Sequence, residues 1–543
     1  MDRYNRDVEK LMYELVAVQS DTGTAQELEV ERFIYEWFSR LDYFKKNDRN
    51  FGYFHMKNDP FKRSAVWALV KGKGDETIIL LNHHDVVDSF DYGELMEFAY
   101  KPAALKEKMA GMELNDEVKA DLHDDDWIFG RGTADMKAGA AIEMKLVESF
   151  SEVDYFSGNV LFISVPDEEN LSLGMRDAVL LLEDLKNEFS LDYKFTINTE
   201  PHNRDRQDEY VYFDGSVGKL LMSVYVKGKR THMGEIFKGL NPSYVLSKII
   251  DKTEMNTDFS DFSHGMVTPP PSWGFARDFK ERYDVSVPEA AGGYIGFLTL
   301  ESTPYEIMSE LKNICKEACD EAYRDINRNF KRFNNIKESY DIKTRVLTYQ
   351  ELMSEALAYD DNLTNSVIED KKKEIAGKIN RGEITLAESN LLLIKSLLDI
   401  IPDKNPVVVL SISPPYYPHI LKDNIDLKDR YLLDIDDNIS GFLYKNTALD
   451  VKNKKAFMGI SDGSYFDFQC GRGVGNYVKE NMPLWGSLYS IPFEGMKNLG
   501  IPVINLGPWG KDIHKISERV NRIDLNETVP NLIRYIIEGY FKR

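Results

Sequence analysis

Two histidines and an aspartate stand together at His83-His84-Asp85, directly after an apolar run. The run, from Thr77 to Leu81, consists of β-branched and aliphatic residues and predicts a buried strand. In open α/β sheets, ligands bind just beyond the carboxyl ends of the strands. Because imidazole and carboxylate groups bind divalent metal ions, we expect a metal site at this strand end.

Acidic residues follow other predicted elements in the same way. The apolar runs at 159–165 and 193–197 predict two more strands, and each ends in acids. A glycine-rich turn at 130–132 precedes a further acid and then an apolar helix. Several converging ends that each carry acids indicate one shared site. The acids are Asp135, Glu168, Glu169 and Glu200.

The residue types limit which metal site can form. The chain has three cysteines, and their spacing matches no zinc-binding or disulfide pattern. A site made from His, Asp and Glu suits two divalent ions that share a bridging carboxylate. A nearby carboxylate that binds no metal can take a proton from an attacking water and deliver it to a leaving amine. This chemistry is the hydrolysis of an amide bond.

The elements around these residues indicate an α/β fold. Strands that alternate with helices predict a mostly parallel central sheet flanked by helices. After about residue 208 the order strand-helix-strand-helix predicts an inserted α+β lid or dimerisation domain. We expect a catalytic domain in two segments, 1–207 and 405–543, with the lid at 208–350 and a helical insertion at 351–404. Residues 89–125 are charged and are expected to be irregular.

The composition argues against several classes of partner. The net charge of −22 disfavours binding to nucleic acid or to an anionic membrane, since both need cationic patches. No segment has the roughly 20 apolar residues of a membrane span. The first residues lack the apolar core of a signal peptide, so we expect a cytoplasmic protein.

The motifs resemble those of the co-catalytic zinc aminoacylase/carboxypeptidase family of metallopeptidases, which also includes dipeptidases and succinyl-diaminopimelate desuccinylase. Five motifs occur in the order of that family. They are His83-His84-Asp85, Gly130 to Lys137, Asp167-Glu168-Glu169, Glu200-Pro201, and Gly507-Pro508 followed by His514. The length, the 351–404 insertion and Pro414-Pro415-Tyr416-Tyr417-Pro418 bring the chain closest to the arginine-utilization (RocB-type) branch.

The resemblance implies a role for each matching residue. Asp135 would bridge two metals, and a cis peptide bond would follow it. Asp85 would orient His83 by a hydrogen bond. Glu168 would be the general base and then the general acid. The resemblance gives one metal the ligands His83, Asp135 and Glu200, and the other metal Asp135, Glu169 and His514.

The resemblance also extends to the inserted domain. His232, in the segment Val226 to His232, resembles the lid histidine that stabilises the tetrahedral oxyanion, often in a partner subunit of a homodimer. Family members that bind a substrate carboxylate use an arginine near the strand that matches Tyr294 to Leu300, and this strand has none. The sequence therefore leaves open whether the substrate must carry an α-carboxylate. Zinc is the expected metal, with Co²⁺ or Mn²⁺ as alternatives.

The expected function is metal-dependent hydrolysis of an amide bond in a small N-acyl amino acid or a short peptide, within arginine catabolism. The alternative is a non-catalytic binding or regulatory member of the same fold, although no ligand residue is missing. A serine hydrolase is disfavoured because Gly463-Ser464 and Gly486-Ser487 do not form a nucleophile elbow.

Overall fold

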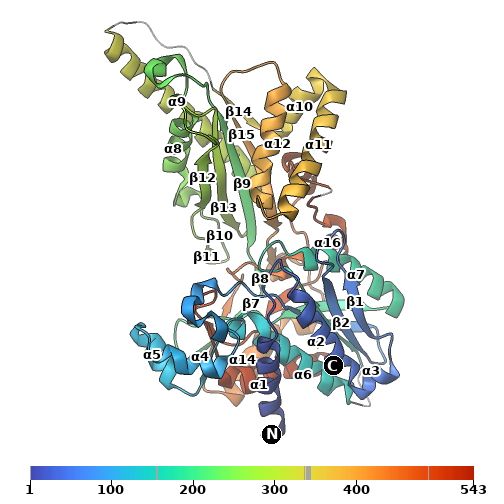
Figure 1. Ribbon diagram of the computed structural model, residues 1–543. Coiled ribbons are helices and arrows are strands. Elements are labelled where there is room, and N and C mark those ends of the chain that lie inside the picture. The colour runs from blue at the N-terminus through green and yellow to red at the C-terminus, as the bar shows by residue number, and fades with distance from the viewer. Residues whose placement is uncertain (1, 154–156, 336, 338–343, 487, 543) are drawn as a thin grey trace. The chain divides into compact units, whose positions relative to one another are not determined.

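The computed structural model describes residues 2–153, 157–335, 337, 344–486 and 488–542 (Figure 1). Ser487 therefore lies outside the described residues. The chain forms two compact units. Unit 1 comprises Met1–Ser216, Ile420–Gln469 and Pro492–Arg543, and unit 2 comprises Val217–His419 and Cys470–Ile491.

Unit 1 is built on an eight-stranded mixed sheet. Its middle strands β5, β3, β6 and β18 are parallel neighbours, while β1 and β2 add antiparallel pairs at one edge. The strand order is β1 (Phe51–His55), β2 (Ser64–Lys71), β5 (Asn159–Val165), β3 (Glu76–His83), β6 (Asp192–Asn198), β18 (Val503–Asn505), β7 (Glu209–Phe213) and β17 (Asp450–Lys454). The predicted α/β class, with a central sheet flanked by helices, is confirmed.

Helices cover this sheet because its central strands are apolar on both faces. Ile78 and Leu80 of β3 pack in one core cluster with residues of α1, α2, α6 and α17. Successive side chains of a strand point to opposite faces, and α7 packs on β2 and β5 without contributing to that cluster. The helices are α1 (Asp2–Ala17), α2 (Glu27–Ser39), α6 (Ala138–Ser151), α7 (Leu173–Phe189), α14 (Ile435–Asn446), α16 (Phe493–Leu499) and α17 (Val529–Phe541).

The segment expected to be irregular contains helices. Residues 89–125 include a 3₁₀ segment, Phe90–Phe98, and the short helices α4 (Pro102–Met109) and α5 (Asp116–His123). Asn115 caps α5 by accepting a hydrogen bond from the Val118 N–H, and the apolar side chains of these pieces form a small separate core with Trp127 and Trp509. These helices were not recognised in the sequence because the segment is rich in charged residues and the apolar face of each helix is only one or two turns long.

Unit 2 contains a five-stranded sheet in the order β12 (Ser272–Asp278), β13 (Ala290–Thr299), β9 (Gly218–Lys227), β15 (Val407–Tyr417) and β14 (Arg345–Thr348). Helices α8 (Pro242–Thr253), α9 (Pro304–Asn334) and α12 (Leu386–Ile400) pack on it, and α10 (Tyr349–Tyr359) and α11 (Asp361–Asn380) pack with α12. Three of the expected domain boundaries differ from those of the structure. Residues 208–216, which include β7, lie in unit 1 and not in the inserted domain. Strand β15 pairs with β9, so residues 405–419 lie in unit 2, as does the segment 470–491 with α15 (Val474–Asn481).

None of the described helices combines the length and the uninterrupted apolar stretch that a membrane crossing would take.

Candidate metal centre

The end of strand β3 places His83 at the centre of the candidate site. Strands β5 and β6 flank β3 on either side, and both run parallel to it. His83 pairs with Val165, the last residue of β5, and Leu81 pairs with Asn198, the last residue of β6. The loops that follow β5 and β6 therefore start beside His83, and these loops carry the expected acids.

Asp135 lies between the two histidines of the site. It belongs to the turn Thr133–Lys137, just before α6, and the peptide bond that follows it is cis, as the resemblance implied. Its Oδ1 is 3.0 Å from His83 Nε2, and its Oδ2 is 3.3 Å from His514 Nε2. One carboxylate that faces two imidazoles with different oxygens has the geometry of a bridging ligand.

Glu200 and Glu169 complete one cluster each. The Oε1 atom of Glu200 lies 3.7 Å from His83 Nε2, and the carboxylate of Glu169 lies 3.0 Å from His514 Nε2. The segment that follows strand β18 approaches Glu200 closely, because a Cβ atom on Gly507 would stand 1.9 Å from the Glu200 carbonyl oxygen. This contact explains the glycine of the Gly507-Pro508 motif.

The two clusters fit divalent metal ions. The candidate donor atoms of each cluster lie within 4.8 Å of one another, and Asp135 belongs to both clusters. The donors are imidazole nitrogens and carboxylate oxygens, a set that suits zinc and similar divalent ions. The first cluster is His83, Asp135 and Glu200, and the second is Asp135, Glu169 and His514.

Glu168 lies beside the first cluster but is not part of either. Its Oε2 is 3.9 Å from His83 Nε2, and its side chain is 9% exposed. Burial raises the pKa of Glu168 well above its ordinary value, and the charges of Glu200 and Asp462 raise it further. A buried carboxylate at the edge of a metal site can accept a proton from a water molecule there.

Negative charge is in excess among the site residues, and their pKa values are shifted accordingly. Burial also raises the pKa values of Glu169 and Glu200, and the charge of Asp135 adds to both shifts. Hydrogen bonds to Asp135 and Glu169 raise the pKa of His514 to about 10. Two divalent cations would supply the positive charge that these crowded carboxylates lack.

Asp85 lies beside His83, as expected, and has further partners in the loop of the two glutamates. Its carboxylate oxygens each accept a hydrogen bond at 3.1 Å, one from the Glu168 N–H and one from the Glu169 N–H. The Nδ1 atom of His83 is 3.0 Å from the Asp85 backbone carbonyl and 3.6 Å from its Oδ1. Asp85 therefore fixes the loop of the two glutamates, and its main chain holds the ring of His83.

Two other histidines of the sequence motifs, His84 and His232, have different surroundings. His84 is buried, its Nδ1 is 3.0 Å from Ser164 Oγ, and burial lowers its pKa to about 3. It belongs to neither metal cluster, in agreement with the absence of a role for it in the sequence motifs. His232 lies in unit 2, where its exposed ring accepts a hydrogen bond from the Gly234 N–H at 3.1 Å.

Two buried arginines, Arg131 and Arg63, support the site through ion pairs that the sequence did not predict. The Glu518 carboxylate binds Arg131 at 2.7 Å and also accepts hydrogen bonds from the N–H groups of Ala134 and Asp135. Burial raises the pKa of Glu518 to about 7. Arg131 lies within the Gly130 to Lys137 motif. Glu518 is distant in sequence and lies in none of the motifs, so the sequence did not indicate that it is part of the site.

Arg63 supports the other side of the site. Its guanidinium is 4% exposed and binds Glu27, Asp59 and Asp167 at 2.6, 2.9 and 2.8 Å. Asp167 immediately precedes the two glutamates and has a positive φ of 70°, so this network anchors an unusual backbone turn. No sequence motif contained Arg63.

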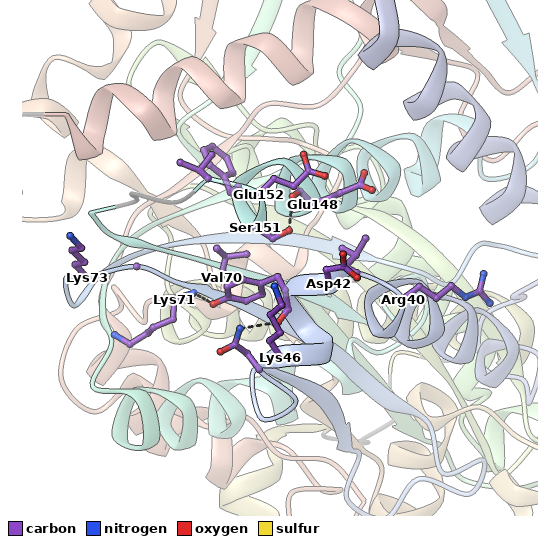
Figure 2. A pocket seen from close by; sticks show the side chains of 15 residues that line it. Arg40, Asp42, Lys46, Val70, Lys71, Lys73, Glu148, Ser151 and Glu152 are labelled. Atoms are coloured by element: carbon purple, nitrogen blue, oxygen red, sulfur yellow. Dashed lines mark hydrogen bonds between the residues drawn. The ribbon is translucent and has the colours of Figure 1, made fainter.

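A surface hollow elsewhere on unit 1 is separate from this centre. It has a volume of about 790 Å³ and lies where residues 40–47, with the short helix α3 (Asp42–Lys46), and the end of α6 meet the β2–β3 turn (Figure 2). Its labelled residues include Lys46, Lys71 and Glu148, and the Lys71 N–H donates to the Tyr43 hydroxyl. None of the metal-cluster residues lines it.

Comparisons with known proteins agree with this picture. The family described as Peptidase family M20/M25/M40 matches residues 82–537. YqjN from Bacillus subtilis (strain 168) is 32% identical over 540 residues, covering 98% of this chain and 96% of YqjN. Protein RocB from the same organism is 30% identical over 548 residues, covering 98% and 95%. The fold is similar to that of an M20 family metallo-carboxypeptidase, Sso-CP2, from Sulfolobus solfataricus, with a TM-score of 0.56, 11% identity and full coverage of both chains.

Proposed function

The chain belongs to peptidase family M20/M25/M40, a family of metallopeptidases, and we propose that it hydrolyses the amide bond of a small N-acyl amino acid or a short peptide. The observation that carries this proposal is the pair of three-residue clusters that share Asp135, with Glu168 beside them. The resemblance to the arginine-utilization branch supports a role in arginine catabolism. A cytoplasmic location and a homodimer are parts of the same proposal.

Each residue of the site has a role in the proposed mechanism. The five cluster residues would hold two zinc ions, which when bound polarise the scissile carbonyl and lower the pKa of the attacking water. Glu168 takes the proton of that water and later delivers it to the leaving amine. The Asp85 carboxylate holds the Glu168 backbone in place during both transfers. His232 would stabilise the oxyanion of the tetrahedral intermediate.

The experiment that tests this proposal is turnover of a pooled library of N-acyl amino acids and dipeptides, rich in arginine and ornithine derivatives, followed by mass spectrometry. Zinc-loaded protein is compared with the same protein stripped of metal. We expect cleavage that depends on metal and that names the substrate class. A protein with two bound ions that cleaves no amide in the library would contradict the proposal.

A further inference from the structure

The loop that contains Asp462 is attached to the metal centre by a strand end. Asp462 begins a short 3₁₀ segment, Asp462–Tyr465, and the preceding Ser461 has an Oγ that accepts hydrogen bonds from the Gly463 N–H and from Asn198 Nδ2. Asn198 is the last residue of β6 and stands two residues before Glu200. The Asp462 loop is therefore held at the same edge of the sheet as the metal clusters.

The Asp462 carboxylate is buried and poorly satisfied. The residue is 3% exposed, and neither of its side-chain oxygens accepts a hydrogen bond of good geometry from a described residue. The Ser172 side chain is the neutral donor that faces it, and burial raises the pKa of Asp462 to about 7. A buried carboxylate without a cationic partner costs free energy, so natural sites that keep one commonly use it.

Asp462 acts electrostatically on the residues of the proposed mechanism. Its carboxylate lies close enough to the carboxylates of Glu168 and Glu200 for their charges to interact. Among the charged groups that shift Asp462 itself are His83, Asp85 and Asp167, and neither a lysine nor an arginine is one of its main influences. Asp462 is therefore an acid of the metal centre that belongs to neither ligand cluster among the described residues.

A charge count indicates what kind of group would compensate it. Apart from Asp167, which pairs with Arg63, six carboxylates interact at this centre. Two divalent cations would balance four of their charges, and the buried Lys137 acts on Asp85. Negative charge then remains beside Glu168, where the substrate must lie if this residue is the general base. A cationic group on the substrate would pair with the unsatisfied acid. The six are Asp85, Asp135, Glu168, Glu169, Glu200 and Asp462.

We propose that Asp462 binds a cationic group of the substrate, an ammonium or a guanidinium, beside the bond that is cleaved. The inference rests on the proposed amide hydrolysis and deepens it by naming the charge of the substrate. Two sources share this chemistry: the side-chain cation of an N-acylated basic amino acid, and the free α-ammonium of a short peptide.

The test compares matched substrates that differ in one cation. N-acetyl-arginine is compared with N-acetyl-citrulline, in which a neutral ureido group replaces the guanidinium. Alanyl-alanine is compared with lactoyl-alanine, in which a hydroxyl replaces the α-ammonium. The zinc-loaded wild type is measured beside Asp462→Asn, an isosteric variant. The control is Asp467→Asn, the same change at a nearby acid whose carboxylate accepts a hydrogen bond from the Phe468 N–H.

We expect the wild type to prefer the cationic member of one pair by about 10- to 100-fold in kcat/KM, the range of a charge-assisted hydrogen bond. The pair that shows this preference identifies whether Asp462 binds a side-chain cation or the α-ammonium. In Asp462→Asn the preference should fall to within about 3-fold, mainly through a higher KM for the cationic member, and in the control it should persist. The variant should keep two metal ions and the thermal stability of the wild type.

Three results would overturn the inference. The first is equal hydrolysis of both members of both pairs by the wild type, which would leave amide hydrolysis itself intact. The second is a preference that survives in Asp462→Asn, and the third is loss of a metal ion from that variant, which would make Asp462 a support of the metal centre.

If no substrate in the set is cleaved, the proposed amide hydrolysis is contradicted, but the role of Asp462 can still be tested by binding. Calorimetric binding of arginine against citrulline, and of alaninamide against lactamide, then decides the role of Asp462. A cation preference in either pair that Asp462→Asn abolishes supports the role, and equal affinities in both pairs exclude it.

Discussion

Replacing Arg63 by methionine should destabilise the protein in a pH-dependent way. The substitution keeps much of the side-chain volume and removes the guanidinium that binds Glu27, Asp59 and Asp167. Breaking a buried ion pair by removing one partner costs about 3–5 kcal/mol, because the other charge stays buried and uncompensated. We expect a loss of that order in the free energy of unfolding at pH 8.

The sign of the pH dependence follows from Asp167. Burial raises the pKa of Asp167, and Arg63 acts against this rise, so the variant should have a still higher Asp167 pKa. A carboxyl with a raised folded pKa stabilises the folded state at low pH and loses that contribution as pH rises through the folded pKa. The deficit of the variant should therefore be larger at pH 8 than at pH 5.5.

The assay is urea unfolding of metal-free protein at the two pH values, followed by tryptophan fluorescence and circular dichroism. The matched control is Arg49→Met, which removes an exposed pair with Glu188 and should cost less than about 1 kcal/mol. A deficit for Arg63→Met as small as that of the control, or one of equal size at both pH values, would refute the reasoning. The first result would mean that the network is not stabilising, and the second that only packing was lost.

Three further predictions concern the metal ions. Chelation should lower the unfolding temperature in scanning calorimetry, since a ligand at 100 times its Kd contributes about 2.7 kcal/mol to the folded state, and zinc should restore it. His514→Ala should retain one ion per chain instead of two by elemental analysis, because the first cluster does not contain this residue; two tightly bound ions would exclude His514 as a ligand. Zinc binding should release protons and strengthen from pH 6 to pH 8, because Asp135 and Glu169 raise the pKa of His514 to about 10 in the metal-free protein and a ligand imidazole must be neutral. Calorimetry in buffers of different ionisation enthalpy measures this release, and an affinity independent of pH would contradict it.

The sequence predicted the parts of the fold that follow from local patterns. The apolar strands β3, β5 and β6 and the acids at their ends were recognisable because a buried parallel strand is apolar throughout and its ligands follow at once. The long helix α9 likewise begins at a local signal, a capping box at Thr303 followed by Pro304.

Features that depend on distant residues were not predictable. Strand β15 was assigned to the larger domain, although it pairs with β9 across nearly two hundred residues of chain. The apolar residues from Val407 to Ile412 predict a buried strand, but they do not indicate which of the two sheets the strand joins. The buried partners Arg63, Glu518 and Asp462 also lacked a signal, because single charged residues in a sequence of ordinary composition most commonly lie at the surface.

The most direct test of the proposed centre combines a metal count with a rate for Glu168→Gln. The amide side chain cannot accept the proton of the attacking water, but Glu168 belongs to neither ligand cluster. We predict two bound ions per chain by native mass spectrometry in both wild type and variant. The variant should have a kcat lower by about 10²- to 10⁴-fold for the substrate found in the library. A variant that binds two ions and turns over at the wild-type rate would contradict the general-base role, and one that loses an ion would place Glu168 among the ligands.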